Sequence, residues 1–341
     1  MLNFDDARFH SIQAGAVALA EPIQQAIRQL FDEGVDNLHF LGAGGAGVLM
    51  LPAAQLLQRM SVLPTFLQQP AEMMAMGSVS LGPRSLVVLP SLSGTTPETI
   101  AMSAYAHERG ARVIALTGDA DSPVAQAADI NFTNFAEDDT SSESFYLQSL
   151  LLVLAILEAR GELTGFDGGF DGIVAELRLL PELMLAAKRA FEPRAGELAA
   201  AFRDEPYHII TGAGGTWAQA WYYGTCILEE MQWIRTRPIH AADFFHGTLE
   251  LVEPGVSVML FMGEDAGRGL VERVGRFVPT VTDKVTVLDT ATVPLPGVSA
   301  PVRALISQAL IATLTERLSA HLEVLRDHPL TTRRYYRRLD Y

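Results

Sequence analysis

Short apolar runs alternate with longer segments of helical character along the first half of the chain. The runs are rich in Val, Ile, Leu and Phe, as strands buried on both faces usually are. The apolar runs lie at residues 38–41, 85–90, 112–117 and 129–135, and the helical segments lie at 45–60, 96–109 and 144–160. This alternation predicts a parallel α/β sheet built in the order strand, helix, strand.

A second series with the same alternation follows. A polar, glycine-containing stretch at 165–172 and a long helical segment at 173–201 precede it. Its strands are expected at 207–211, 256–262 and 284–288, and its helices at 217–231, 265–277 and 302–318. The chain is therefore predicted to form two doubly wound domains, and the expected segments are a first domain at 1–170, a helical linker at 171–201 and a second domain with a C-terminal tail at 202–341.

Each series begins with a glycine loop between its first strand and its first helix. The first loop, G-A-G-G-A-G at 42–47, satisfies the G-x-G-x-x-G fingerprint of dinucleotide-binding folds, and the second, G-A-G-G-T-W at 212–217, ends in tryptophan. The pair indicates an internal duplication. The fingerprint also needs an acid about 20 residues further on, but residues 64–70 contain none. A nicotinamide cofactor is not expected, and Gly44 and Gly45 instead let a substrate approach the backbone.

Hydroxyl side chains gather in the loop after the strand at 85–90. Ser91, Ser93 and Thr96 lie before Pro97, and proline is favoured in the first turn of a helix. A helix N-terminus with several hydroxyls makes a site for an anion such as phosphate, without any Lys or Arg. The alternative is an ordinary helix cap, in which one hydroxyl caps the helix and the others are incidental.

The net charge restricts the partners that the protein can bind. The chain has 341 residues, of which 49% are hydrophobic and 19% charged, and its formal charge is −15. Binding to nucleic acid or to an anionic membrane needs a basic surface, so neither partner is expected. The composition is that of a folded protein with a large core, and an anionic substrate must be held by a local site.

Cysteine content and the longest apolar stretches bear on the location of the protein. Cys226 is the only cysteine, which excludes an intramolecular disulfide and a cysteine-based zinc cluster. The first ten residues are acidic and polar, unlike a signal peptide. The apolar stretch at 150–157 is shorter than the roughly 20 residues of a membrane span. A cytoplasmic location is therefore predicted.

Several segments carry a family resemblance. The hydroxyl loop S-L-S-G-T-T at 91–96, the strand before it and the duplication resemble the sugar isomerase (SIS) domain, whose paired copies bind phosphosugars through such a loop. Segments that are similar to the fructosamine-6-phosphate deglycases, of the fructoselysine and fructose-asparagine type, are E-E-M-Q-W-I at 229–234, I-H-A-A-D-F-F-H-G-T-L-E at 239–250 and H-P-L-T-T-R-R-Y at 328–335. The resemblance implies an α/β fold of two tandem SIS domains, each a flavodoxin-like, doubly wound parallel sheet.

The resemblance also implies an activity. Such an enzyme cleaves a phosphorylated fructosamine, which is an Amadori product, into glucose 6-phosphate and a free amine or amino acid. A related SIS synthase domain has a hydroxyl residue where this chain has Gly44 or Gly45, so phosphate contacts there would come from the backbone alone. Arg235 stands where many relatives have a histidine, which leaves the released amino acid open.

Releasing the amine requires moving a proton between C1 and C2 to give an imine, which water then hydrolyses. A carboxylate and an imidazole can perform this chemistry without a metal or a redox cofactor. By resemblance, Glu230 and His246 occupy the two catalytic positions, and which of them is acid and which base stays open. From spacing alone, Glu230 would be a solvated helix charge and His246 a loop histidine. Met231 and Trp233 are expected in the core.

Further polar residues are assigned to the substrate. His240 is either a second imidazole of the site or a structural residue, and the resemblance implies no zinc site formed with Asp243 and the catalytic histidine. Arg333 and Arg334, in the tail, can contact a carboxylate or phosphate bidentately. Ser141 is expected on a loop that approaches the sugar.

Two other function classes fit the same sequence. The first is a phosphosugar aldose–ketose isomerase or an amino-sugar-phosphate deaminase, because enolisation at C1 and C2 is shared. The second is a non-catalytic phosphosugar sensor, although a basic DNA-binding N-terminal extension is lacking and Glu230 and His246 favour catalysis. We also expect a homodimer or a higher even-numbered oligomer, in which His246 would by resemblance complete the site of the partner.

Overall fold

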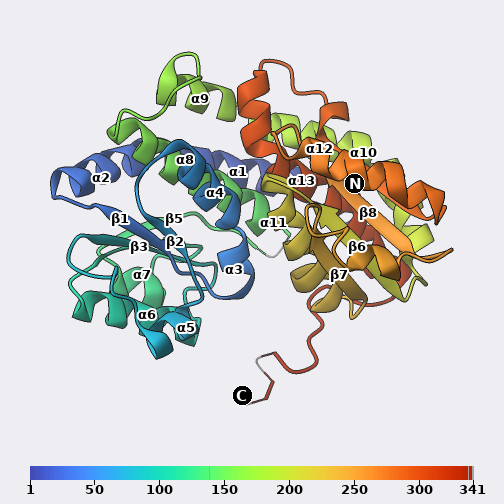
Figure 1. Ribbon diagram of the computed structural model, residues 1–341, viewed down its shortest axis with the longest axis horizontal. Helices are drawn as coiled ribbons and strands as arrows, with labels where there is room; N and C mark the ends of the chain where they lie inside the picture. The colour runs from blue at the N-terminus through green and yellow to red at the C-terminus, as the bar shows by residue number, and fades with distance from the viewer. Residues whose placement is uncertain (138, 337, 340–341) are drawn as a thin grey trace. The chain divides into compact units, whose positions relative to one another are not determined.

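The computed structural model describes residues 1–137, 139–336 and 338–339, which fold into two units (Figure 1). The N-terminal unit comprises Ala7–Pro181 and Gly297–Val302, and the C-terminal unit comprises Met1–Asp6, Glu182–Pro296 and Arg303–Tyr341. Each unit has its own parallel sheet, which confirms the predicted α/β class with two doubly wound sheets. The domain boundaries at 170 and 201 stay a prediction.

The sheet of the N-terminal unit has the strand order β2-β1-β3-β4-β5, and all of its neighbouring strands are parallel. Its strands are β1 (Asn37–Phe40), β2 (Thr65–Leu67), β3 (Ser85–Ser91), β4 (Arg112–Thr117) and β5 (Ile130–Thr133). Every residue of β3 is buried. A central parallel strand is covered by helices on both faces, so its apolar run is continuous rather than alternating.

Helices cover both faces of this sheet (Figure 1). They are α1 (Asp6–Ala18), α2 (Ala20–Asp32), α3 (Gly44–Val48), α4 (Leu51–Met60), α5 (Pro70–Met76), α6 (Pro97–Glu108), α7 (Pro123–Ala127), α8 (Ser141–Ala159) and α9 (Gly169–Leu177). Helices α2 and α4 pack against α8, whereas α5 and α7 pack against α6. By length and composition α8 could cross a membrane, but 89% of its apolar window is buried inside the protein. Such burial is typical of a core helix.

The C-terminal unit repeats the same winding. Its sheet has the order β7-β6-β8-β9, which is the order of the first four strands of the N-terminal sheet. Its strands are β6 (Tyr207–Gly212), β7 (Arg235–His240), β8 (Ser257–Met262) and β9 (Val285–Asp289). Its α-helices are α10 (Leu180–Phe202), α11 (Gly215–Tyr222), α12 (Arg268–Phe277) and α13 (Ala300–Leu325). Shorter elements are the π-helix η1 (Tyr223–Glu229) and the 3₁₀-helices η2 (Thr248–Leu251), η3 (Val278–Thr280) and η4 (Thr290–Thr292). The shared strand order supports the duplication inferred from the glycine loops.

The two edge strands β2 and β7 were not among the expected strands. β2 has three half-buried residues, and β7 carries two arginines and Pro238, so neither has the apolar run of a central strand. Proline is tolerated in β7 because the strand lies at the sheet edge, where an N–H group is not needed. The helix expected at 45–60 is also divided, into α3 and α4, because Pro52 lies at the start of a new helix.

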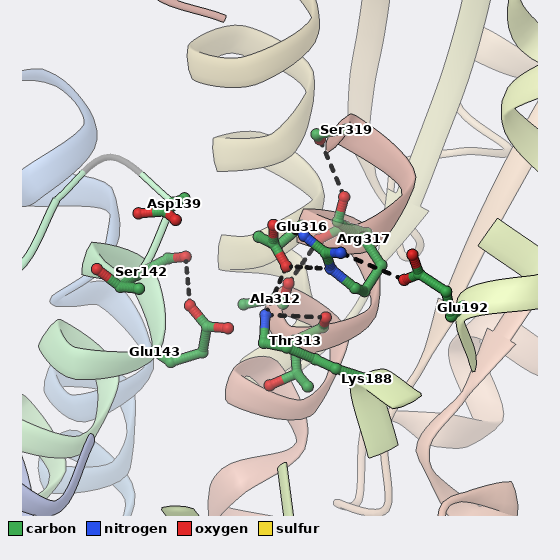
Figure 2. Close-up of polar contacts among 12 residues, drawn as sticks. Asp139, Ser142, Glu143, Lys188, Glu192, Ala312, Thr313, Glu316, Arg317 and Ser319 are labelled. Carbon is green, nitrogen blue, oxygen red and sulfur yellow. Dashed lines mark hydrogen bonds and ion pairs between the residues drawn. The ribbon is translucent and has the colours of Figure 1, made fainter. Parts of the chain in front are cut away.

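Buried charges join α10 to α13 within the C-terminal unit (Figure 2). Lys188 Nζ lies 2.8 Å from Glu316 Oε2, and the Arg317 guanidinium contacts Glu316 at 2.6 Å and Glu192 at 3.3 Å. Burial alone would raise the pKa of Glu316, but Lys188 and Arg317 hold that pKa below its ordinary value. Arg317 also donates to the backbone carbonyl of Leu2, so this network fixes the N-terminal segment to the unit.

Candidate active site

The strand order creates a topological switch point in the N-terminal unit. β1 lies between β2 and β3, and in open α/β sheets ligands bind beside such a point, at the carboxyl ends of the strands. The glycine loop at 42–47 follows β1 and the hydroxyl loop at 91–96 follows β3. A Cβ atom on Gly42 would lie 2.7 Å from Pro90 Cγ, so the two loops begin side by side. The structure therefore brings the two predicted phosphate-binding loops together.

The hydroxyl loop does not form the ordinary helix cap that was the alternative. Thr96 is the residue before α6, but its side chain makes no capping hydrogen bond. Its hydroxyl lies 3.4 Å from the hydroxyl of Ser91, which is 3% exposed. Ser93 accepts hydrogen bonds from the backbone N–H and the hydroxyl of Thr95, at 3.3 and 2.9 Å. Ser91 and Thr96 thus face each other at the end of β3.

The glycine loop leaves open space for a ligand at its tip. Gly44 has a φ of 56°, a left-handed conformation that favours glycine, and a Cβ atom there would meet no atom within 4 Å. Gly44 is exposed and Gly45 is half-buried. Both residues begin α3. A contact between their backbones and a substrate stays a prediction.

Ser141 does not lie on a loop, and that part of the prediction is wrong. It is the first residue of α8 and is buried, because the helix begins three residues earlier than the apolar pattern indicated. The next two residues, Ser142 and Glu143, are buried as well, and the Ser142 hydroxyl donates to Glu143 Oε2 at 3.2 Å (Figure 2). A contact between Ser141 and a sugar stays a prediction.

The C-terminal unit has an equivalent switch point between β6 and β8, but a side chain of the protein fills it. Asp265, which follows β8, accepts hydrogen bonds from the backbone N–H groups of Gly215 at 2.8 Å and Gly267 at 2.7 Å. A Cβ atom on Gly214 would lie 2.2 Å from the Asp265 carboxylate. The carboxylate therefore takes the place at the N-terminus of α11 that a bound anion would occupy. The sequence pattern of two equal loops did not indicate this difference.

His240 lies beside the second glycine loop. It is the last residue of β7 and pairs with Gly212 in β6. Its Nδ1 accepts the backbone N–H of Ala242 at 3.1 Å, which places the proton of the neutral ring on Nε2. Burial lowers the pKa of His240, against an opposing effect of Asp243, and the Trp217 ring lies 5.6 Å away, edge to face. His240 is therefore a neutral, oriented imidazole near neutral pH.

Glu230 directly follows the π-helix η1, where a continuous α-helix was expected. A Cβ atom on Gly224 would lie 2.5 Å from Pro238 Cγ, so glycine permits the close approach of β7 at this turn. Glu230 Oε1 lies 2.9 Å from Arg333 Nε, and the two side chains are 39% and 14% exposed. Glu229, in contrast, accepts hydrogen bonds from the backbone N–H and hydroxyl of Thr236. The neighbouring carboxylates thus have different environments.

Trp233 is not in the core, so that expectation is wrong, whereas the buried position expected for Met231 is confirmed. Trp233 has a φ of 54° and is 39% exposed. It packs against the tail: the His328 ring lies 4.5 Å away, edge to face, and Arg334 Cζ lies 3.9 Å from the centre of the indole ring. Gln232 Nε2 donates to the His328 carbonyl at 2.7 Å. The segments 229–234 and 328–335 therefore contact each other.

His246 lies in the turns that follow β7 and is exposed. Its backbone N–H donates to the Asp243 carbonyl at 2.9 Å, and Gly247 follows with a φ of 137°. Its imidazole makes no hydrogen bond or ion pair with any residue that the structure describes. The side chain is consequently available to a ligand or to another chain.

The described residues contain neither a cluster of metal ligands nor a reactive thiol. Within 1–137, 139–336 and 338–339, no group of three His, Cys, Asp or Glu side chains is placed to hold a metal ion. Burial raises the pKa of Cys226 to about 11, so its thiol is protonated at neutral pH and is a poor nucleophile.

Comparison with known proteins decides the family. The SIS domain model matches residues 33–158, which include both loops of the N-terminal switch point. A solved structure of a Bacillus subtilis protein proposed to be a phosphosugar isomerase is 30% identical, with a TM-score of 0.87, and the match covers 96% of this chain and 99% of that one. The chain belongs to the SIS domain family. These two matches confirm the resemblance to the SIS family that the sequence motifs indicated.

Two deglycases are similar to this SIS protein over almost its whole length. Fructosamine deglycase FrlB of Bacillus subtilis is 29% identical over 324 residues, which is 94% of this chain and 97% of that protein. Fructoselysine 6-phosphate deglycase of Escherichia coli is 26% identical over 314 residues, which is 92% of this chain and 89% of that protein. The similarity therefore extends well beyond the SIS match and includes residues of both units.

Proposed function

We propose that this SIS protein is a phosphosugar deglycase that cleaves a fructosamine 6-phosphate into glucose 6-phosphate and a free amine or amino acid. The observation that carries the proposal is the match of two deglycases over more than nine-tenths of the chain. The hydroxyl loop, the glycine loop and the pair Glu230–Arg333 supply the phosphate-binding and proton-transfer groups that such a reaction needs.

The phosphate is assigned to the N-terminal switch point. The hydroxyls of Ser91, Ser93 and Thr96 donate to its oxygens, and the backbone of the exposed Gly44 and the half-buried Gly45 lies on the neighbouring loop. A phosphate dianion needs donors rather than a cationic side chain when hydroxyls and helix N–H groups converge on it. The Thr96 hydroxyl faces Ser91 and does not cap α6, which supports this assignment.

Glu230 is assigned to the proton transfer. Its carboxylate removes a proton from C1 of the ketoamine while the C2 carbonyl oxygen gains a proton, which gives an enaminol. Return of a proton to C2 gives the C1 imine, water adds to C1, and the C1–N bond breaks to release the amine and the aldehyde form of glucose 6-phosphate. The overall reaction is a hydrolysis, so its balance includes no electron acceptor and no metal. Glu230 suits the role better than Glu229, whose carboxylate is already bound to Thr236.

His246 is assigned the second proton transfer, and His240 the polar part of the substrate. Because the His246 imidazole is exposed and makes no hydrogen bond within the described chain, we propose that it enters the site of a second copy in a homodimer or higher even-numbered oligomer. Mixing inactive Glu230→Gln with inactive His246→Ala subunits tests this. Mixed dimers regain activity if the two groups of one site come from different chains, and they stay inactive if each chain supplies both.

The activity is tested by supplying 6-phosphorylated fructosamines of several amino acids and measuring glucose 6-phosphate and the free amine together. A deglycase releases both in equal amounts. Glucosamine 6-phosphate and fructose 6-phosphate serve as matched substrates for the alternative deaminase and isomerase. Turnover of either one, with none of the fructosamines, would replace the proposal, and binding without any turnover would favour a sensor. The amino acid preference, like a cytoplasmic location, stays a prediction.

A further inference from the structure

We infer that Arg333 is a positioning residue that holds the Glu230 carboxylate ionised and aimed, so that the C-terminal tail forms part of the proton-transfer apparatus. The inference rests on the proposed function, because Glu230 is the proton-transfer group there. It differs from the sequence-based interpretation, in which Arg333 was assigned to the substrate. The partner that the structure gives Arg333 is a protein carboxylate at 2.9 Å.

The Arg333 guanidinium is itself fixed by the tail. Its Nη1 donates to the carbonyl oxygens of Leu330 at 2.6 Å and Thr332 at 3.1 Å, and its Nε lies 2.9 Å from Glu230 Oε1. The side chain is only 14% exposed. An arginine held by two backbone carbonyls loses less rotamer freedom when it pairs with a carboxylate than a free surface arginine would. The pair is therefore better organised than an ordinary surface ion pair.

Docking of the tail supplies the second support. Gln232 and Trp233, which follow Glu230 in sequence, contact His328, and the Leu330 N–H donates to Glu323 at 3.0 Å. The tail thus binds both the segment that carries Glu230 and helix α13. Trp233 adopts a left-handed φ of 54°, which is rare for an aromatic residue and is usually retained only where surrounding contacts require it. These contacts fix the position of Arg333 relative to Glu230.

Two titratable side chains on the same segment as Glu230 bring no positive charge to it. Glu229 is the adjacent carboxylate, and Cys226 is a buried thiol in the preceding turn. A neighbouring carboxylate disfavours the charged form of Glu230, whereas a guanidinium in contact favours it. Contact with Arg333 therefore favours the charged form of the Glu230 carboxylate, which is the form that can accept a proton from C1.

The test compares the variants Arg333→Gln and Arg333→Lys with the control Arg334→Gln. The wild-type Arg334 side chain packs on the Trp233 ring, whereas it is Arg333 that forms the ion pair with Glu230. For Arg333→Gln we expect kcat to fall about 5- to 50-fold with KM changed less than about threefold, since the loss affects the proton transfer. The acidic limb of the pH profile should move up by about half to one pH unit, a shift reduced by the solvent around Glu230. Arg333→Lys should recover part of kcat, and Arg334→Gln should leave the pH profile in place.

Two outcomes would overturn the inference. A large rise in KM with kcat and the pH profile unchanged would make Arg333 a substrate ligand, and an unchanged enzyme would make the pair incidental. A cycle of urea unfolding with Arg333→Gln, Glu230→Gln and the double variant is independent of any substrate. The pair predicts that Arg333→Gln destabilises the wild type but not the Glu230→Gln protein. Equal effects in both backgrounds would refute the contact even if the deglycase proposal failed separately.

Discussion

Removing the two facing hydroxyls of the phosphate loop gives a prediction whose size follows from their geometry. Ser91→Ala with Thr96→Val deletes the hydroxyls that lie 3.4 Å apart while keeping side-chain volume. Each donates to a charged oxygen, and such a hydrogen bond is worth about 1.5–3 kcal/mol, or roughly a 10- to 100-fold change in affinity. Because neighbouring deletions are not additive, KM for the phosphorylated substrate should rise about 10- to 1,000-fold.

The fold should survive this change, because the Thr96 side chain does not cap α6. Kinetics are compared for a phosphorylated fructosamine and its unphosphorylated analogue. The analogue should be used as poorly by the variant as by the wild type. Thr99→Val is the matched control, since Thr99 lies in the first turns of α6 with a buried side chain. An equal loss for both substrates, or a similar loss in the control, would refute the assignment of the hydroxyls to phosphate.

Three further predictions concern single residues. Glu230→Gln should lower kcat by about 10²- to 10⁴-fold with a similar KM, measured by release of glucose 6-phosphate. Burial lowers the pKa of His208 from 6.5 to about 4. Because the unfolded chain then binds the proton more readily, the free energy of unfolding should be highest above pH 6.5 and fall by up to about 3 kcal/mol toward pH 4. In urea titrations, the His208→Asn protein should lack this part of the pH dependence. Glu316→Gln should lower the free energy of unfolding by about 3–5 kcal/mol at neutral pH, because it removes the carboxylate charge that contacts the buried Lys188 and Arg317.

The central strands were predictable because burial on both faces leaves a continuous apolar run. β4 was expected at 112–117 and lies at Arg112–Thr117, and β3 differs from its expected range by one residue. The edge strand β7 was not predictable in this way, because none of its six residues is fully buried and they include Arg235, Arg237 and Pro238. The pattern of hydrophobic residues reflects burial, so it does not predict a strand that is stabilised mainly by backbone hydrogen bonds.

The candidate site was predictable where a local motif defines it. The hydroxyl loop and the glycine loop follow strands that the sequence located, and the fold then places them at one switch point. Three features depend on contacts between residues that are distant in sequence. Asp265 accepts a hydrogen bond from the second glycine loop, Arg333 pairs with Glu230, and the tail packs against Trp233. Spacing along the chain carries no information on such contacts, and two similar loops could not be told apart before their neighbours were known.

The measurement that tests the account most directly uses a fructosamine 6-phosphate with two deuterium atoms at C1. Removal of one proton from C1, followed by hydrolysis of the imine, predicts glucose 6-phosphate with a single deuterium at C1, formed in equal amount with the free amine. The product is analysed by NMR and mass spectrometry, with the Glu230→Gln protein as the control that should form almost none. Fructose 6-phosphate that retains both deuterium atoms would mean direct displacement of the amine by water, and would contradict enolisation by Glu230.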